Sequence, residues 1–293
     1  MKVLFLLQST TGNTAVITEA ASRILKLSGI ETQIVNIVKH ALPESYEEFD
    51  ALFICSSVMY FRPLIQMEKV LANMPAIEGK PVFALATCAG GPGGFFDIID
   101  DILRNKGTEL TGSFYTLAPS NWPLHLHIAT KIPGQSIGDF LSLKFPSFRP
   151  LLGFPWPGSC TPSIKDADKL EEWVSAAGTF LKSSTSDGVP KVKTSLLMSA
   201  LGKMTTHSQI EKGMDLFIDH VKCTKCGLCV KNCPAKIIAQ NDLKEVPHFK
   251  SGCHGCYTCY NICPAAAIGQ KYARGPGSQY HGPSPEMKSV FLS

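Results

Sequence analysis

The sequence predicts a doubly wound α/β domain with a five-stranded parallel sheet, followed by a small, cysteine-rich α+β domain. Three observations lead to this fold class. Segments with strand and helix spacing alternate over residues 1–183, a hydroxyl-rich turn follows the first apolar segment, and eight of the eleven cysteines lie between Cys223 and Cys263. Apolar residues make up 44% of the 293 residues, enough for a sizeable core, so folded domains rather than disorder are expected.

The expected strands and helices of the first region follow one another in turn. The five expected strands are Lys2–Leu7, residues 31–38, Ala51–Cys55, Pro81–Ala86 and Leu110–Leu117. Apolar residues from Val16 to Leu25 recur at helical spacing, and Gly29 stands where a helix would end. Further helices are expected over Leu64–Ala72, Gly94–Lys106 and Asp166–Leu181. Strands that alternate with helices predict a parallel sheet.

The turn after the first strand has the composition of a phosphate-binding loop. It consists of Ser9, Thr10, Thr11, Gly12, Asn13 and Thr14. A helix that starts here offers free backbone N–H groups and the positive end of its dipole, and Gly12 permits a close approach. No lysine follows as in nucleoside triphosphate loops, which disfavours that ligand. The alternative is an ordinary helix cap.

Two further loops follow the third and fourth strands and reach the same edge of a parallel sheet. The candidate residues are Ser57, Val58, Met59, Tyr60 and Phe61 in one loop, and Thr87, Cys88, Ala89, Gly90 and Gly91 in the other. The aromatic pair either stacks on a ligand or packs against the sheet. The glycines either approach a ligand or form a plain turn. Cys88 lies in the second of these loops, where a lone cysteine is more often a small buried residue than a redox thiol, and Trp122 is a weaker ligand candidate.

The cysteines of the second region form a repeat with an offset of thirty residues. Both runs read C-x2-C-x2-C-x3-C-P, the spacing of bacterial ferredoxins with two [4Fe–4S] clusters. In such proteins the fourth cysteine of each run reaches the other cluster. The expected ligands are Cys223, Cys226, Cys229 and Cys263 for one cluster, and Cys253, Cys256, Cys259 and Cys233 for the other.

Structural zinc is the alternative for these cysteines. Zinc sites use two ligand pairs with a long gap between them, which unbroken runs of four cysteines do not match. The segment from Asp215 to Gly275 carries four acidic residues and eight basic ones, an excess of +4. The lysines either raise the potentials of the clusters or form an ordinary solvated face.

The three N-terminal loops resemble the flavin-binding loops of flavodoxins, and the whole chain resembles flavodoxin–ferredoxin fusion proteins of anaerobic bacteria and archaea. The resemblance covers residues 1–183 by motif and residues 216–270 by the cysteine spacing. It implies a flavodoxin-like domain that binds FMN at the carboxyl ends of the strands, together with a dicluster ferredoxin domain.

Four segments complete the expected domain plan. Residues 1–183 form the first domain, within which residues 121–160 are a Pro- and aromatic-rich insertion, about forty residues long where a few are usual. This insertion is expected to be a lid or docking surface, or to pack on its own domain or on a dimer mate. Residues 184–214 form a linker with a short helix, 215–275 the cluster domain, and 276–293 a loose tail.

The leading functional hypothesis is an FMN- and iron–sulfur-dependent oxidoreductase that couples one-electron to two-electron chemistry. The alternatives are a non-enzymatic carrier between redox enzymes, an NAD(P)H-dependent flavin or quinone reductase, and a docking platform that has lost FMN. The expected partner is a ferredoxin, an oxidoreductase or a small electron acceptor, and a homodimer is possible.

Composition disfavours other roles. The net charge of +4, without a basic aromatic-rich run, gives no reason to expect nucleic acid. No apolar stretch is long enough to span a membrane. The first apolar run is short for a signal peptide and lacks a small-residue cleavage site, so a cytoplasmic location is expected.

Overall fold

The N-terminal domain is built on a parallel sheet. The structure is a computed structural model, and it describes residues 1–126, 162–183, 188–242, 244–271 and 273–293. Its parallel strands are β1 (Lys2–Gln8), β2 (Glu31–Asn36), β3 (Ala51–Met59), β5 (Val82–Cys88) and β6 (Leu110–Leu117). Their order is β2-β1-β3-β5-β6, which is the 2-1-3-4-5 order of flavodoxin-like sheets. The short β4 (Arg62–Pro63) pairs antiparallel with β3. The predicted doubly wound sheet is therefore confirmed.

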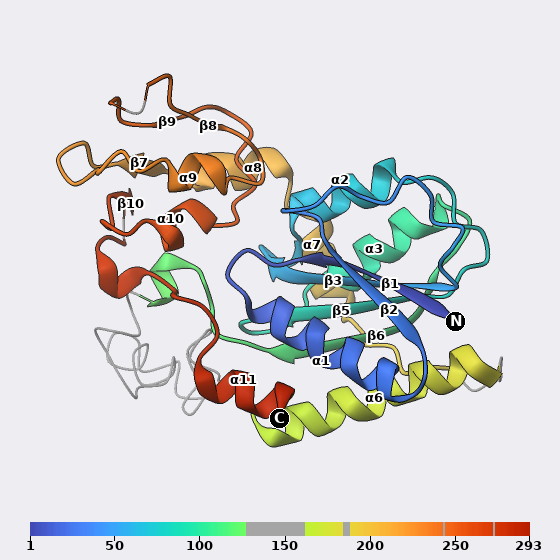
Figure 1. The fold of residues 1–293 in the computed structure, drawn as a ribbon. Helices are drawn as coiled ribbons and strands as arrows, with labels where there is room; N and C mark the ends of the chain where they lie inside the picture. Colours follow the sequence, from blue (N-terminus) through green and yellow to red (C-terminus); the bar gives the residue numbers. More distant parts are fainter. Residues whose placement is uncertain (127–161, 184–187, 243, 272) are drawn as a thin grey trace, which may run out of the picture.

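Helices cover both faces of this sheet. The helices are α1 (Asn13–Leu27) and α6 (Ile164–Ser183) on one face and α2 (Ile65–Asn73) and α3 (Phe95–Arg104) on the other (Figure 1). Each face packs its own apolar cluster, so the central strands are buried on both sides. In the described part of the chain, no helix has the length and apolar character needed to span a bilayer.

Aromatic side chains from adjacent strands fix the layer beneath α6. Phe5, Phe53 and Phe83 come from β1, β3 and β5, and neighbouring ring centroids lie 4.6 and 4.7 Å apart. Trp173 of α6 meets Phe53 edge-on at 5.9 Å. Because the three strands are in register, one aromatic row spans the sheet and receives the helix.

The C-terminal domain is small and consists of short elements around the two cysteine runs. Its strands are β7 (Leu216–Ile218), β8 (Ile238–Ala239), β9 (His248–Phe249) and β10 (Ile268–Gln270), and its helices are α9 (Leu228–Lys231) and α10 (Thr258–Ile262). The pairs β7–β10 and β8–β9 are antiparallel. The carboxyl ends of the N-terminal sheet point toward this domain (Figure 1).

The predicted linker helix forms, but its apolar residues are not buried. The linker contains α7 (Leu196–Met204) and a second, unexpected helix, α8 (His207–Gly213). The side chains of Leu196, Leu197 and Met204 remain 91%, 70% and 73% exposed. The helix instead contacts the first domain through Gly202, where a Cβ would stand 2.5 Å from the Phe61 carbonyl oxygen.

The expectation of a loose tail is wrong. Residues 276–278 form a 3-10 turn, and α11 (Pro285–Leu292) packs against α1 and α6. Ser284 caps α11 by accepting a hydrogen bond from the Met287 N–H, and Met287 and Phe291 are buried. The Pro/Gly/Ser composition suggested a loose tail, but the local helix signals are stronger. These signals are a capping serine, a proline at the first helical position and two apolar residues one turn apart. The insertion lies outside the described residues from residue 127 onward.

Candidate functional site

A cavity lies at the carboxyl edge of the sheet, where the loops after β1, β3, β5 and β6 meet. Its lining contains eleven of the predicted residues, namely Ser9, Thr10, Thr11, Asn13, Thr14, Ser57, Val58, Met59, Thr87, Cys88 and Ala89. The loop after β6 completes it with residues 118–121. The fold thus brings the three predicted loops together at the point where the strand order reverses.

The first loop is held in shape by its own side chains. The Ser9 hydroxyl accepts hydrogen bonds from the backbone N–H groups of Gly12 and Ala15 at 3.2 and 3.3 Å. Gly12 has φ 105°, a conformation that favours glycine. The Thr14 hydroxyl lies 2.8 Å from the Thr87 hydroxyl, which ties the first loop to the third.

This loop fits a bound phosphate. Asn13 and Thr14 are buried at the start of α1, where the first N–H groups of a helix have no intrahelical partner. Thr10 and Thr11, two further hydroxyl-bearing residues of the same loop, line the same cavity. Helix dipole, N–H groups and hydroxyls are together the donor set that a phosphate monoester such as that of FMN requires.

Six predicted residues are not among those that line the cavity: Gly12, Tyr60, Phe61, Gly90, Gly91 and Trp122. The side chains of Tyr60 and Trp122 pack against the core of the C-terminal domain. Phe61 is 46% exposed. Flavin contact by these six residues stays a prediction.

The four cysteines expected at the first cluster line one small cavity. Cys223, Cys226, Cys229 and Cys263 share it with Leu228. Burial raises the pKa of the Cys229 thiol, and the neighbouring Cys263, Cys223 and Cys226 raise it further. The fourth cysteine of the second run therefore lies beside the first three of the first run, as a cluster-binding fold requires.

The other four cysteines also gather, deeper in the molecule. Burial raises the pKa of the Cys253 thiol to about 11, and the neighbouring Cys256 and Cys233 contribute to the rise. Burial likewise raises the pKa of the Cys259 thiol, with contributions from the same three cysteines. Within the described residues, no group of three or more His, Cys, Asp or Glu is placed to hold a single metal ion.

The two cysteine runs repeat the same backbone with different side chains. We call residues 223–233 the first cluster loop and residues 253–263 the second cluster loop. Lys225 and Gly227 have φ values of 62° and 71°, and Gly255 and Tyr257, thirty residues later, have 66° and 55°. A tyrosine thus occupies a left-handed position that is glycine in the first loop. Such a conformation costs about 1 kcal/mol, so contacts elsewhere must offset it.

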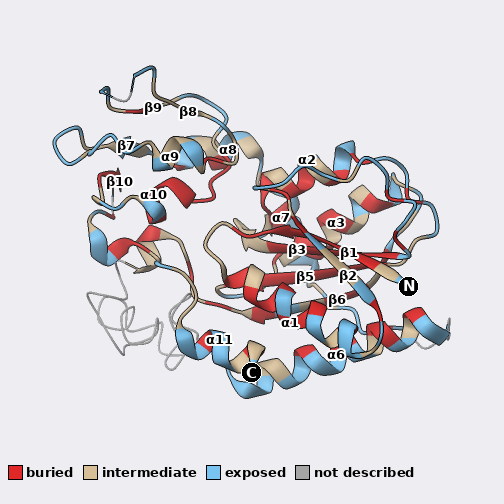
Figure 2. Cartoon of the chain, in the orientation of Figure 1, coloured by how far each residue is buried: buried red, intermediate tan, exposed pale blue. Residues whose placement is uncertain are grey.

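The second cluster loop packs directly on the N-terminal domain. The Tyr257 hydroxyl lies 2.9 Å from the hydroxyl of Tyr60, which follows β3. A Cβ on Gly255 would stand 3.0 Å from the Tyr60 ring, so glycine permits this close approach. Figure 2 shows α10 largely buried, whereas α9 of the first loop has no buried residue.

Asn121 belongs to both sites. It lines the cavity of the N-terminal domain, and its side-chain amide donates a hydrogen bond to the Cys256 carbonyl at 3.3 Å. Its own carbonyl accepts a hydrogen bond from the Asn261 side chain at 3.0 Å. Met59 also lines the cavity and packs against the core of the C-terminal domain. Single residues therefore separate the cavity from the second cluster loop.

The segment after residue 275 is a site component that sequence reasoning missed. The Gln279 side chain donates hydrogen bonds to the carbonyls of Tyr260 and Cys263, both at 2.8 Å. The Tyr280 hydroxyl donates to the side-chain oxygen of Asn13. A Cβ on Gly12 would stand 2.8 Å from Pro283. This segment thus crosses from the cluster domain to the phosphate loop.

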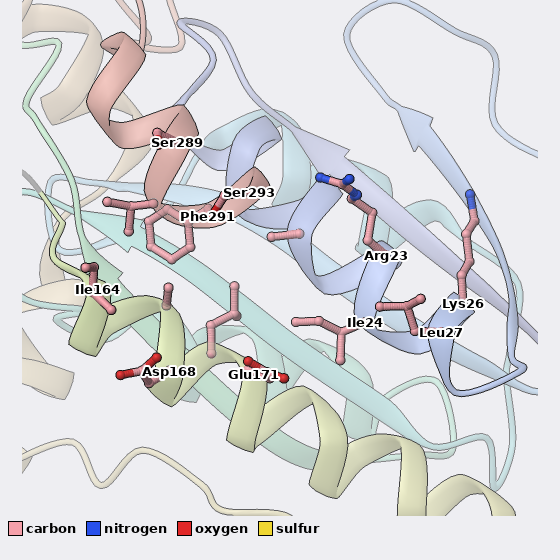
Figure 3. A pocket seen from close by; sticks show the side chains of 14 residues that line it. Arg23, Ile24, Lys26, Leu27, Ile164, Asp168, Glu171, Ser289, Phe291 and Ser293 are labelled. Atoms are coloured by element: carbon pink, nitrogen blue, oxygen red, sulfur yellow. The ribbon is translucent and has the colours of Figure 1, made fainter.

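A second hollow lies away from all of the predicted cofactor- and cluster-binding residues. It runs between α1, α6 and α11, with Arg23 and Lys26 on one side and Asp168 and Glu171 on the other (Figure 3). None of the predicted loops reaches it. The chemistry of the chain is concentrated at the carboxyl edge of the sheet and in the cluster domain.

One family model and one curated relative match the cluster domain. Residues 215–268 match the family model described as a 4Fe-4S dicluster domain. The ketoisovalerate oxidoreductase subunit VorC of Methanothermobacter marburgensis is 36% identical over 53 residues, which are 16% of this chain and 67% of that protein.

Solved structures similar to the N-terminal part include a flavodoxin from the domain Archaea, with 24% identity over 41% of this chain and 87% of that chain and a TM-score of 0.34. Flavodoxin 1 from Bacillus cereus shows 12% identity over 40% of this chain and 84% of that chain, also with a TM-score of 0.34. The fold class of the domain rests on its own strand order.

Strand order and cysteine pattern together define the class of the molecule. The chain belongs to the proteins that join a flavodoxin-like domain to a 4Fe–4S dicluster ferredoxin domain. It is an electron-transfer protein.

Proposed function

We propose that this chain relays electrons between an external redox protein and FMN bound in the N-terminal domain, by way of two [4Fe–4S] clusters. When bound, the clusters supply one-electron steps and the flavin supplies one- or two-electron steps. The observation that carries the proposal is the position of Asn121, which lines the cavity and bonds to the Cys256 carbonyl.

The residues of the chain have distinct tasks in this proposal. Asn13 and Thr14 hold the phosphate at the start of α1, with Ser9 fixing the loop. The eight cysteines hold the clusters in two crossed sets. Tyr60 and Tyr257 fix the distance between the second cluster loop and the sheet.

Burial at this junction also serves the function. Cys256 and Cys259 are 8% and 9% exposed, and Tyr257 is 1% exposed. The buried Cys256, Cys259 and Tyr257 would keep water away from a cluster bound by the second set and so favour transfer toward the cavity over transfer to solutes. Cys226 is exposed, so a cluster bound by the first set would be the one that exchanges electrons with an outside partner.

The similarity to VorC supports a protein partner rather than a small molecule. That relative is named as a subunit of an oxidoreductase. Residues 215–268 would by analogy serve a partner oxidoreductase or ferredoxin. A nicotinamide-dependent reductase is the competing function, in which a nicotinamide would reduce the flavin directly.

Rapid mixing without oxygen separates these functions. The relay predicts that a reduced ferredoxin bleaches the clusters first and the flavin afterwards, whereas NADH and NADPH bleach neither within the same time. Flavin bleaching by a nicotinamide cofactor ahead of the clusters would contradict the relay. A Cys256→Ala variant tests the route of the electrons. If it retains FMN but reduced ferredoxin no longer bleaches the flavin, the electrons pass through the second cluster loop.

A further inference from the structure

The first cluster loop and the turn after it carry an excess of positive charge. Residues 220–241 contain four lysines, all exposed, and no acidic residue; they are Lys222, Lys225, Lys231 and Lys236. Acidic groups flank this stretch: Asp219 lies 3.6 Å from Lys222, and Asp242 and Glu245 follow on either side of Lys244. The second loop differs, since residues 251–270 contain no lysine, arginine, aspartate or glutamate.

Apolar residues are also exposed within the same stretch of the chain. Val221 is 96% exposed and Leu228 is 37% exposed. Leu228 also lines the cavity of the first four cysteines, and Cys226 beside it is exposed. This stretch therefore combines an exposed apolar residue beside a cluster ligand with exposed lysines, which are the residue types of a docking site with an apolar core and a charged rim.

We infer that this surface, which we call the basic face (Val221, Lys222, Lys225, Leu228 and Lys231), docks an acidic one-electron redox protein. The inference rests on the proposed function and adds the place and the charge of the partner. In the transfer, one electron leaves the reduced partner, which is oxidised, and one electron reduces the cluster held by Cys223, Cys226, Cys229 and Cys263. No bond forms or breaks, and the reverse transfer uses the same face.

The charge pattern favours this occupant over others. A partner must come close to a cluster for rapid transfer, and the second cluster loop is closed off by the N-terminal domain. Opposite charges steer encounter and raise association rates by 10 to 10³ at low salt. A basic face on a ferredoxin-like domain therefore matches a carrier of net negative charge.

Charge reversal on the basic face provides the test, in the full chain with its cofactors. The variant is Lys225→Glu with Lys231→Glu, and the matched control is Lys165→Glu with Lys169→Glu on α6, which changes the net charge equally. A second variant, Val221→Asp, alters an almost fully exposed side chain. The probe is an acidic 2[4Fe–4S] ferredoxin, oxidised for calorimetric binding and reduced for stopped-flow cluster reduction.

We expect the probe to bind wild type and control alike, and the basic-face variant at least about tenfold more weakly at low salt. The difference in affinity should vanish near 0.5 M salt, where the Debye length falls to about a few ångströms and exposed charges no longer attract the partner. Reduction by methyl viologen radical, a small cation, should not slow in any variant. Iron content at the wild-type value in each variant confirms that the clusters are intact, and flavin bleaching by the reduced probe tests the proposed function separately.

Other outcomes overturn the inference. Equal weakening in the control would assign the effect to net charge alone. Unchanged binding in both the charge-reversal and the Val221→Asp variants would place the partner elsewhere. Binding of the chain to phosphatidylglycerol vesicles through these lysines, without binding of the ferredoxin, would make the face a membrane contact. Loss of cluster reduction with binding preserved would count against the relay rather than against the docking face.

Discussion

The two cluster loops share one cysteine spacing and one backbone, yet they occupy opposite environments. The first carries lysines and keeps Cys226 exposed, whereas the second is uncharged and lies against the flavodoxin-like domain. The residues between the cysteines account for the difference, because the spacing itself is identical. The two loops thus form an outer end and an inner end of the cluster domain, and this asymmetry would give the proposed relay its order.

Removal of one cysteine from each loop should give the largest effects and the sharpest contrast. We expect Cys226→Ala and Cys256→Ala each to reduce iron from about eight to about four per chain. Cys256→Ala should also destabilise the junction by several kcal/mol, on the order of 3, because a buried group is lost between two domains. Calorimetric unfolding should show a coupled loss in both domains for Cys256→Ala only.

The asymmetry would be refuted by the opposite pattern. If Cys226→Ala lowered the unfolding temperature of the N-terminal domain as much as Cys256→Ala, the second loop would have no special tie to that domain. FMN content and far-ultraviolet circular dichroism check that the sheet itself remains folded in both variants.

The tyrosine pair should contribute a smaller, measurable coupling. Tyr60→Phe, Tyr257→Phe and the double variant form a cycle around the 2.9 Å contact between the two hydroxyls. We expect a coupling free energy of about 1 kcal/mol from denaturant unfolding, since each change removes a partner from a partly buried hydrogen bond. Strictly additive effects would show that the contact does not stabilise the junction. Tyr115→Phe, on an exposed strand residue, is the matched control.

Loss of the Tyr280 hydroxyl should weaken flavin binding without affecting the clusters. Tyr280 donates to the Asn13 side chain, whose amide in turn donates to the Pro119 carbonyl at 2.9 Å. Tyr280→Phe should raise the FMN dissociation constant about fivefold, or about 1 kcal/mol, because the phosphate loop loses a support. Fluorescence titration measures this, and Ser289→Ala on the exposed side of α11 should leave the constant unchanged. An unaltered constant in Tyr280→Phe would limit this segment to domain packing.

A single lysine should have the smallest effect. Lys225→Gln removes a positive charge beside Cys226, so the reduced and more negative state of the first cluster is less favoured and its potential falls. We expect a decrease on the order of tens of millivolts for one cluster and none for the other. Redox titration followed by electron paramagnetic resonance resolves the two. Equal shifts of both clusters, or an equal shift in Lys169→Gln, would contradict the assigned asymmetry.

Local patterns in the sequence predict the sheet and the ligands, because both depend on spacing. The predicted strands Lys2–Leu7 and Leu110–Leu117 form β1 and β6 with errors of at most one residue at their ends. The crossed cysteine sets follow from the ferredoxin spacing. The thiols of each set lie near one another in the fold, and their ligation of clusters stays a prediction.

The junction between the domains could not be predicted in the same way. The Tyr60–Tyr257 contact joins residues 197 positions apart, and no local pattern encodes such a pairing. The same holds for Tyr280 and Asn13. A signal for α11 was nevertheless present in Ser284 and Pro285, and the uncharged stretch 251–270 already distinguished the buried loop from the exposed one.

The proposed relay is tested most directly by the cofactor content of protein purified without oxygen. Iron, sulfide and FMN per chain are determined together, before and after incubation with added FMN. The proposed relay through two clusters and FMN predicts about eight iron, eight sulfide and one FMN per chain. About eight iron with no flavin, even after FMN is supplied, would contradict it and leave the cavity at the carboxyl edge of the sheet without its proposed ligand.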